Sequence, residues 1–221
     1  MSDAVASGDG RRLVLLRHGQ TSWNAQRRAQ GHTNTGLDET GRAQATLAAP
    51  WVVALGLASV VSSDLARAAD TARIVAEAGD LPLTFDERLR EFDLGQRTGL
   101  TMSEYAALAP EEYRLFRSGQ YDVVLGGEKT AAVVARMRAG IHAALEATGP
   151  GETVLVVSHG ACLKVTLLAL LELPSEAAAH LRALVNCAWA ILEETTAGGS
   201  LRLVSYNLQA PGATAVNGPA F

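Results

Sequence analysis

Two histidines in this sequence each follow an apolar, strand-like run and each precede a glycine. The first lies in VLLRHGQT, residues 14 to 21, and the second in VLVVSHG, residues 154 to 160. The carboxyl ends of parallel strands meet along one edge of a sheet, and ligands bind in the crevice outside that edge. We therefore expect His18 and His159 to face each other across a shared site.

Two arginines and a carboxylate follow the same pattern. Arg17 directly precedes His18, and Arg67 falls in the first turn of a helix that follows the apolar run ASVVSS. A guanidinium and the positive end of a helix can both face an anion at that position. Glu91 lies in ERLREFDLG, shortly after a further strand near residue 83. Four separate segments are thus expected at one edge of the sheet.

These five side chains are the set that phosphoryl transfer through a histidine requires. Planar guanidinium groups suit the oxygens of a phosphomonoester dianion and leave an imidazole free to attack phosphorus. Arg17 and Arg67 bias His18 towards its neutral, nucleophilic form. The leaving alkoxide needs a proton, which Glu91 can supply if apolar neighbours such as Phe92, or the charge of the substrate, keep it protonated.

The elements that position these residues alternate between strands and helices, as in an α/β protein with a mostly parallel sheet. Strands are predicted at 12–16, 58–62, 83–85 and 153–157, and helices at 64–79, where Asp64 is the expected cap, and at 128–148. A helix over 38–56 should be kinked or divided at Pro50. We predict a three-layer α/β/α fold, with one domain over 1–221, a core over 10–208, a helical excursion over 95–127 and a loose tail over 209–221. Two late apolar strands, CAWAILEET and LRLVSYNL, are expected to form an edge hairpin.

Composition limits the partners. The chain has 221 residues, 48% of them hydrophobic, and a net charge of −4, which argues against nucleic acid or an anionic membrane as partner. The N-terminus lacks the pattern of a secretory signal, and the longest apolar run is far shorter than the roughly 20 residues of a membrane span, so we expect a cytoplasmic protein. Cys162 and Cys187 lie in apolar surroundings and are expected to be free buried thiols. The apolar late strands are compatible with a homodimer.

The motifs LLRHGQTSWN, SSDLARAADTA, LREFDLG and VVSHG occur in this order and resemble the histidine phosphatase superfamily, which includes phosphoglycerate mutases and many phosphatases. The resemblance covers roughly residues 12–171. It implies that His18 becomes phosphorylated, that Arg17, Arg67 and His159 hold the phosphoryl group, and that Glu91 is the proton donor and later activates water. It also implies contacts to phosphate or substrate from the residues Asn24, Gln30, Gly31 and Gly160.

The same resemblance favours a phosphatase over a mutase. Mutases similar to this chain grip a substrate carboxylate with a tyrosine and a lysine, and the matching positions here are Leu94 and Met102. The excursion between Glu91 and His159 is also shorter than in those mutases, so water should reach the phosphoenzyme more easily. QGHTNTGL, VNCAWAIL and LRLVSYN further resemble the actinobacterial glucosyl-3-phosphoglycerate phosphatases, whereas GGEKT departs from the Gly-Gly-Glu-Ser common in the family. We predict a metal-independent phosphatase of small phosphomonoesters that needs no cofactor, with a phosphoglycerate mutase as the alternative.

The same residues are compatible with two hypotheses of another class. His18, His159 and Glu91 could form a two-histidine, one-carboxylate metal site, but Arg17 and Arg67 would repel a divalent ion there. A non-catalytic phosphate-binding module would need neither a nucleophile nor an acid. Away from these motifs, His32 is a weaker candidate for substrate contact. The charged residues of the helix that begins at Glu128 are expected to form a solvated face.

Overall fold

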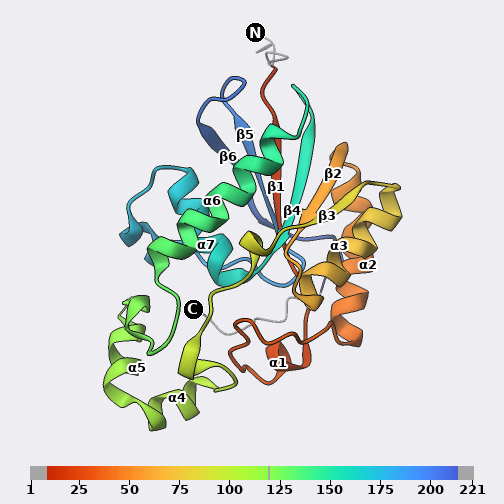
Figure 1. Ribbon diagram of the computed structural model, residues 1–221. Coiled ribbons are helices and arrows are strands. Elements are labelled where there is room, and N and C mark those ends of the chain that lie inside the picture. The colour runs from red at the N-terminus through yellow and green to blue at the C-terminus, as the bar shows by residue number, and fades with distance from the viewer. Residues whose placement is uncertain (1–8, 119, 214–221) are drawn as a thin grey trace.

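A mixed sheet runs through the part of the chain that the computed structural model describes, residues 9–118 and 120–213 (Figure 1). Its strand order is β3-β2-β4-β1-β5-β6. The strands are β1 (Arg12–Arg17), β2 (Leu57–Ser62), β3 (Leu83–Phe85), β4 (Thr153–Ser158), β5 (Trp189–Glu194) and β6 (Leu201–Leu208). The first four are parallel, and β5 and β6 form the expected antiparallel hairpin beside β1. The predicted, mostly parallel sheet is confirmed.

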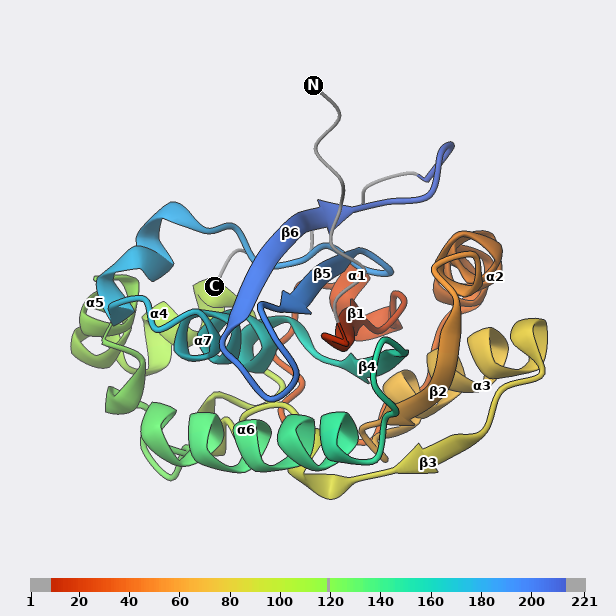
Figure 2. The same cartoon turned by 90° about the horizontal axis from the view of Figure 1, so that it is seen from above.

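Helices cover both faces of this sheet. The described part of the chain forms the helices α1 (Ser22–Ala25), α2 (Glu39–Val53), α3 (Ala66–Gly79), α4 (Met102–Leu108), α5 (Pro110–Arg117), α6 (Thr130–Glu146) and α7 (Gly160–Leu170). Figure 2 shows α2 and α3 on one side of the sheet and α6 and α7 on the other. The three-layer α/β/α fold predicted from the sequence is therefore confirmed.

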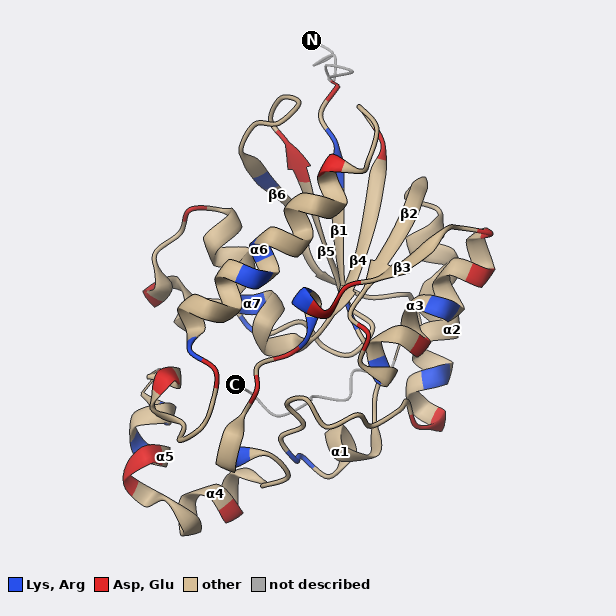
Figure 3. Ribbon diagram, in the orientation of Figure 1, with Lys and Arg blue, Asp and Glu red and all other residues tan. Residues whose placement is uncertain are grey.

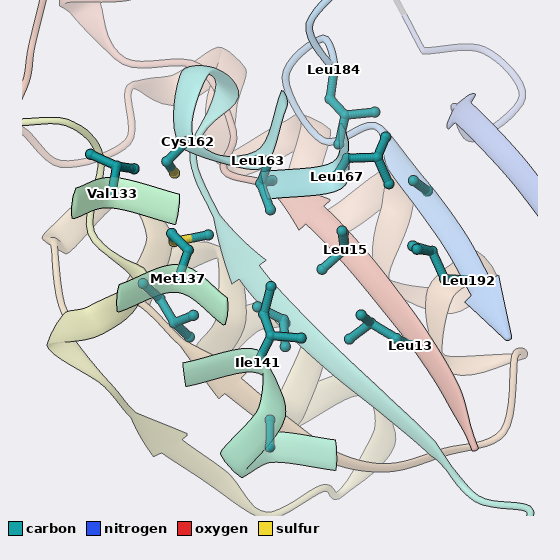
Figure 4. Packing of buried hydrophobic residues seen from close by; sticks show 14 of the residues in the cluster. Leu13, Leu15, Val133, Met137, Ile141, Cys162, Leu163, Leu167, Leu184 and Leu192 are labelled. Carbon is teal, nitrogen blue, oxygen red and sulfur yellow. The ribbon is translucent and has the colours of Figure 1, made fainter. Parts of the chain in front are cut away.

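The alternation of side chains along β1 feeds two separate hydrophobic cores. Leu13 and Leu15 pack with Met137 of α6 and Leu163 of α7 (Figure 4). Val14 and Leu16, which alternate with them, belong to the second core, against α2 and α3. All six residues of β4 are buried. Because β1 and β4 are buried at the centre of the sheet, the polar residues that follow them are held at one place on the sheet edge.

One expectation about helix ends was wrong. Asp64 does not cap α3: Leu65 occupies the cap position without a side-chain cap bond, and Arg90 donates to the Asp64 carboxylate at 2.8 Å. Arg90 engages both oxygens of the Asp64 carboxylate, through Nε and Nη2, and this bidentate ion pair directs the carboxylate away from the helix N-terminus. Pro50, where a kink or a division was expected, does not divide α2, which continues to Val53. It lies in the last turn, where it and Thr46, four residues earlier, are exposed, so water can satisfy the carbonyl that proline leaves unbonded.

The excursion leaves the sheet after Glu91 and holds α4 and α5 around a small core of its own (Figure 1). This core contains Tyr105, Phe116 and Val124. Of the stretch predicted as a tail, Ala210 is buried in the α2 and α3 core, and residues 214–221 lie outside the described part of the chain.

Basic and acidic residues are interspersed along the outer helices rather than separated (Figure 3). Among the described residues, no helix combines the length and the apolar character needed to cross a bilayer.

Candidate active site

His18 and His159 stand side by side at the carboxyl ends of two neighbouring parallel strands. Arg17, the last residue of β1, is in register with Ser158, the last residue of β4, and each histidine follows directly. The His18 backbone N–H also donates to the Ser158 carbonyl at 3.0 Å. As a result, the two imidazole centroids lie 5.1 Å apart, tilted by 59°, as the strand-end pattern predicted.

Hydrogen bonding selects the tautomer of His18. Nδ1 lies 2.6 Å from the Gly19 carbonyl, which can only accept, so Nδ1 carries the proton and Nε2 keeps its lone pair. Burial, followed by the charges of Arg67 and Arg17, holds the pKa of His18 well below its ordinary value. His18 is therefore a neutral imidazole with a free Nε2 at neutral pH. Gly19 must be glycine here, because a Cβ would lie 2.5 Å from the Gly41 carbonyl oxygen.

His159 is held by two partners from other segments. Its Nδ1 accepts a hydrogen bond from Arg67 Nε at 3.1 Å, and Nε2 donates to Ser63 Oγ at 2.9 Å. Burial and the charge of Arg67 lower its pKa well below the ordinary value. His159 is therefore also neutral, with its ring orientation fixed from both sides.

Arg67 reaches two other segments from the first turn of α3. In addition to His159, its guanidinium donates to the Gly31 and Thr33 carbonyls, each at 2.8 Å. Burial lowers its pKa to about 10, so it stays charged at neutral pH. Gly31, expected to contact substrate, adopts a positive φ of 51° and presents its carbonyl to this guanidinium.

Arg17 is buried beside the first turn of α7. It donates to the Leu184 carbonyl at 2.7 Å, and burial lowers its pKa while the charge of Glu91 opposes that shift. Gly160 packs against the guanidinium, since a Cβ at this position would lie 3.2 Å from Arg17 Cζ. The glycine is needed for this close approach.

The Glu91 carboxylate occupies the N-terminus of α7. One oxygen accepts from Ala161 N at 3.1 Å, and the other accepts from Cys162 N at 2.8 Å and from Phe92 N at 3.0 Å. Backbone N–H groups at a helix N-terminus form a favourable site for a negative group. The carboxylate is thereby bound to the residues that follow His159 by two and three positions.

Asn24 and Gln30 are buried, but their side chains form hydrogen bonds with the loop after His18 rather than with the histidines and arginines. Asn24 Oδ1 accepts from Thr21 N at 3.1 Å, and Gln30 Oε1 accepts from Thr21 Oγ1 at 3.0 Å. Both residues thus brace the segment after His18. Asn186 lies against Asn24 and donates to the His18 carbonyl at 3.0 Å.

Several residues at the site were not found from the sequence. Ser63 had a usable signal, since it directly follows β2 at the same sheet edge. Asn186 lies in the motif VNCAWAIL, but the motif does not indicate a contact with His18, because the two residues are far apart in the chain. His32 was a weaker candidate for substrate contact; the structure has its Nε2 donating to the Glu91 carbonyl at 2.7 Å.

The expectation that charges near Glu128 face solvent was wrong for Glu128 and Arg136. Both side chains are about one-fifth exposed, pair with each other at 2.7 Å, and Arg136 also donates to the Glu91 carbonyl at 2.8 Å. The spacing of residues along α6 cannot reveal this arrangement, because the backbone that Arg136 binds lies in another segment, around Glu91.

A pocket with mainly aromatic and aliphatic walls adjoins Glu91. Phe92 and Ala161, whose N–H groups bind the Glu91 carboxylate, both line it, and Phe116 and Val124 come from the excursion. Lys164 of α7 lies in its wall, is 8% exposed and has a pKa lowered by burial. In the described part of the chain, no three His, Cys, Asp or Glu residues form a metal-ligand group.

A family model and several known proteins match most of this chain. A family model described as the histidine phosphatase superfamily, branch 1, matches residues 13–208. The chain is 37% identical to the glucosyl-3-phosphoglycerate phosphatase of Mycolicibacterium vanbaalenii over 81% of this chain and 82% of that protein. It is also 37% identical to a probable phosphoglycerate mutase GpmB of Salmonella paratyphi A, over 79% of this chain and 81% of that protein.

A solved structure of a mycobacterial glucosyl-3-phosphoglycerate phosphatase, in complex with VO3, is similar throughout. Its TM-score is 0.81 at 35% identity, over 90% of this chain and 100% of that one. The relatives named as phosphatases support the predicted class of enzyme, a phosphoric monoester hydrolase. On the family model and these identities, the chain belongs to the histidine phosphatase superfamily.

Proposed function

We propose that this enzyme hydrolyses phosphomonoesters of small metabolites through a phosphohistidine at His18, without a metal ion. The observation that carries the proposal is the hydrogen bond from His18 Nδ1 to the Gly19 carbonyl at 2.6 Å, which leaves Nε2 as the nucleophile. The low pKa of His18 supports the same role, because only a neutral imidazole can attack phosphorus.

In the first step, His18 Nε2 forms a bond to phosphorus while the bond from phosphorus to the ester oxygen breaks. Arg17 and Arg67 neutralise charge on the phosphoryl oxygens. His159 contributes a hydrogen bond when its Nε2–H exchanges Ser63 Oγ for a phosphoryl oxygen. Glu91 gives its proton to the departing oxygen, so that the product leaves as a neutral alcohol.

In the second step, water attacks phosphorus and the bond from phosphorus to Nε2 breaks. Glu91, now a carboxylate, accepts the proton of that water, and inorganic phosphate is released. Two fixed guanidinium groups supply the positive charge that a divalent metal would otherwise provide. This is the basis for proposing that no metal is needed.

The leaving group is proposed to lie in the pocket beside Glu91, because the acid must reach the ester oxygen. Lys164 in that wall supports a leaving group with a negative charge, since an anion would offset the cost of burying the ammonium. Glucosyl-3-phosphoglycerate, the substrate in the name of a relative, and other phosphorylated acids fit this description.

Trapping the intermediate tests the proposal. Brief incubation with a ³²P-labelled phosphomonoester, followed by quenching in base, should leave label on the wild type that acid removes. His18→Ala should retain the far-ultraviolet circular dichroism of the wild type, and should lose both the label and turnover. Substantial turnover by a folded His18→Ala variant would contradict the nucleophile, and complete loss of activity in EDTA, restored by one metal, would contradict metal independence.

The mutase alternative is kept because a 37% identical relative is named a probable phosphoglycerate mutase. Phosphate release and isomerisation of 3-phosphoglycerate, with and without its bisphosphate primer, distinguish the two. Isomerisation that outruns phosphate release would favour the mutase, and phosphate binding without either reaction would favour a binding module.

The homodimer stays a prediction. β6 is an edge strand of the described sheet and exposes Val204 and Leu208, which supports association of two copies through this strand. Sedimentation equilibrium tests it.

A further inference from the structure

Arg136 binds the backbone on which Glu91 stands, rather than the Glu91 carboxylate. Its Nη1 donates to the Arg88 carbonyl at 2.9 Å and to the Arg90 carbonyl at 2.6 Å, and its Nη2 donates to the Glu91 carbonyl at 2.8 Å. Apart from one short turn of 3₁₀ helix at Glu87–Leu89, this segment has no regular structure of its own. A single guanidinium therefore supplies hydrogen bonds that a helix or sheet would otherwise provide.

Glu128 fixes both the guanidinium and the far side of the same segment. Its carboxylate accepts from Arg136 Nε at 2.7 Å and from Nη2 at 2.8 Å, a bidentate pair. Its backbone N–H donates to the Asp93 carbonyl at 2.9 Å, and its side chain accepts from Asp93 N at 3.2 Å. The chain is thus held two residues after Glu91 as well as before it.

A second donor to the Glu91 carbonyl links the clamp formed by Arg136 and Glu128 to the phosphoryl site. His32 Nε2 donates to that carbonyl at 2.7 Å. The residues on either side of His32, Gly31 and Thr33, present the carbonyls that hold Arg67. The backbone of Glu91 is therefore fixed relative to the guanidinium that is proposed to bind phosphate.

We propose that Arg136, locked by Glu128, is a positioning residue that sets the distance between the Glu91 carboxyl and the ester oxygen. The inference rests on the proposed function, in which Glu91 is the acid. Misplacement of a reacting group by about 1 Å can cost about a hundredfold in rate. Loss of the clamp should therefore weaken proton transfer while leaving the histidine and arginine chemistry in place.

The test compares two leaving groups of similar size, p-nitrophenyl phosphate and phenyl phosphate. p-Nitrophenolate leaves without a proton, whereas phenolate benefits from one. Arg136→Gln should lower kcat/KM for phenyl phosphate by about ten- to a hundredfold and for p-nitrophenyl phosphate by less than about threefold. In a Glu91→Gln background, Arg136→Gln should cause no further loss on phenyl phosphate, because it acts through Glu91.

Three further variants separate positioning from charge and from folding. Arg136→Lys keeps the charge but cannot bond three carbonyls and Glu128 together, so it should not restore phenyl phosphate hydrolysis. Glu128→Gln should change the ratio of kcat/KM for the two substrates in the same direction. It replaces Arg136→Gln in the test if that variant does not fold. Arg138→Gln, at an exposed position on the same helix, should leave the ratio unchanged.

The positioning role would be overturned by equal losses of kcat/KM on both substrates or by full rescue in Arg136→Lys. It would also be overturned if Arg136→Gln caused the same loss in the Glu91→Gln background. These results differ from failure of the proposed function, in which the wild type itself would release neither phenol nor p-nitrophenol.

Discussion

Arg67 Nε donates to His159 Nδ1 at 3.1 Å, so a cation and a neutral imidazole share a hydrogen bond in a buried site. The bond forces the proton of His159 onto Nε2, which donates to Ser63. Since the remaining nitrogens of Arg67 bind backbone carbonyls, its planar fork organises three segments of the active site at once.

Arg67→Lys should therefore lower kcat/KM, although it conserves the positive charge. An ammonium cannot reproduce hydrogen bonds from three nitrogens of one plane. Loss of one charge-assisted hydrogen bond, worth about 1.5 to 3 kcal/mol, predicts a fall in kcat/KM of about ten- to a hundredfold. The matched control is Arg73→Lys, on the same helix and paired with Asp70 at the surface, which should keep wild-type kinetics. Unchanged kinetics of Arg67→Lys would contradict the role.

Gly160→Ala should disturb Arg17 without adding or removing charge. The added methyl would stand 3.2 Å from the Arg17 Cζ and Nε atoms, so the guanidinium must move by a few tenths of an ångström. We expect a fall in kcat/KM of about three- to tenfold, measured with p-nitrophenyl phosphate. Gly36→Ala is the control, because its nearest neighbour to an added Cβ is 3.8 Å away. Equal behaviour of the two variants would argue against a precise fit at Gly160.

Lys164→Met should change the choice of substrate rather than the chemistry. Methionine retains an unbranched apolar chain but loses the cation that could meet a charged leaving group in the pocket. The variant should lose about tenfold or more in kcat/KM on 3-phosphoglycerate, while glycerol 3-phosphate, which lacks the carboxylate, should lose little. A loss of similar size on both esters would mean that Lys164 does not recognise a leaving-group anion.

Stability should fall as the pH drops below the ordinary histidine pKa. In the folded protein, burial and the arginine charges keep His18 and His159 neutral, with pKa values well below the ordinary value of 6.5. The unfolded chain thus binds more protons between pH 6.5 and the folded pKa values, and the free energy of unfolding decreases there by about 1.4 kcal/mol per pH unit for each histidine. Urea unfolding of the wild type and of His159→Asn, at about pH 7.5 and about pH 5.5, checks this. The variant should show the smaller pH dependence, and identical slopes would contradict the assignment.

The strands and the main histidine pair could be predicted because their determinants are local. The apolar runs before His18 and His159 specify parallel strands, and parallel strands bring their carboxyl ends together whatever else the chain does. Arg67 followed from its place in the first turn of a helix after such a strand.

Other features depend on contacts between distant segments. Asp64 looks like a helix cap until Arg90, 26 residues later, competes for its carboxylate. Glu128 and Arg136 look like a solvated face until the loop before α4 packs against them. The local sequence around Asp64, Glu128 and Arg136 does not specify these partners, because the partners come from loops that pack against the sheet and helices.

The two thiols offer a reporter that needs no added label site. Cys162 and Cys187 are free and buried, and burial raises the pKa of Cys187 to about 12 and that of Cys162 further. Only the thiolate reacts with maleimides, so in the native protein both sulfurs are masked by the same low-dielectric interior that keeps the histidines neutral. The Cys162 amide also holds Glu91. The rate of Cys162 modification, followed by mass spectrometry, therefore reports how often the first turn of α7 opens and the Glu91 carboxylate loses its backbone hydrogen bonds.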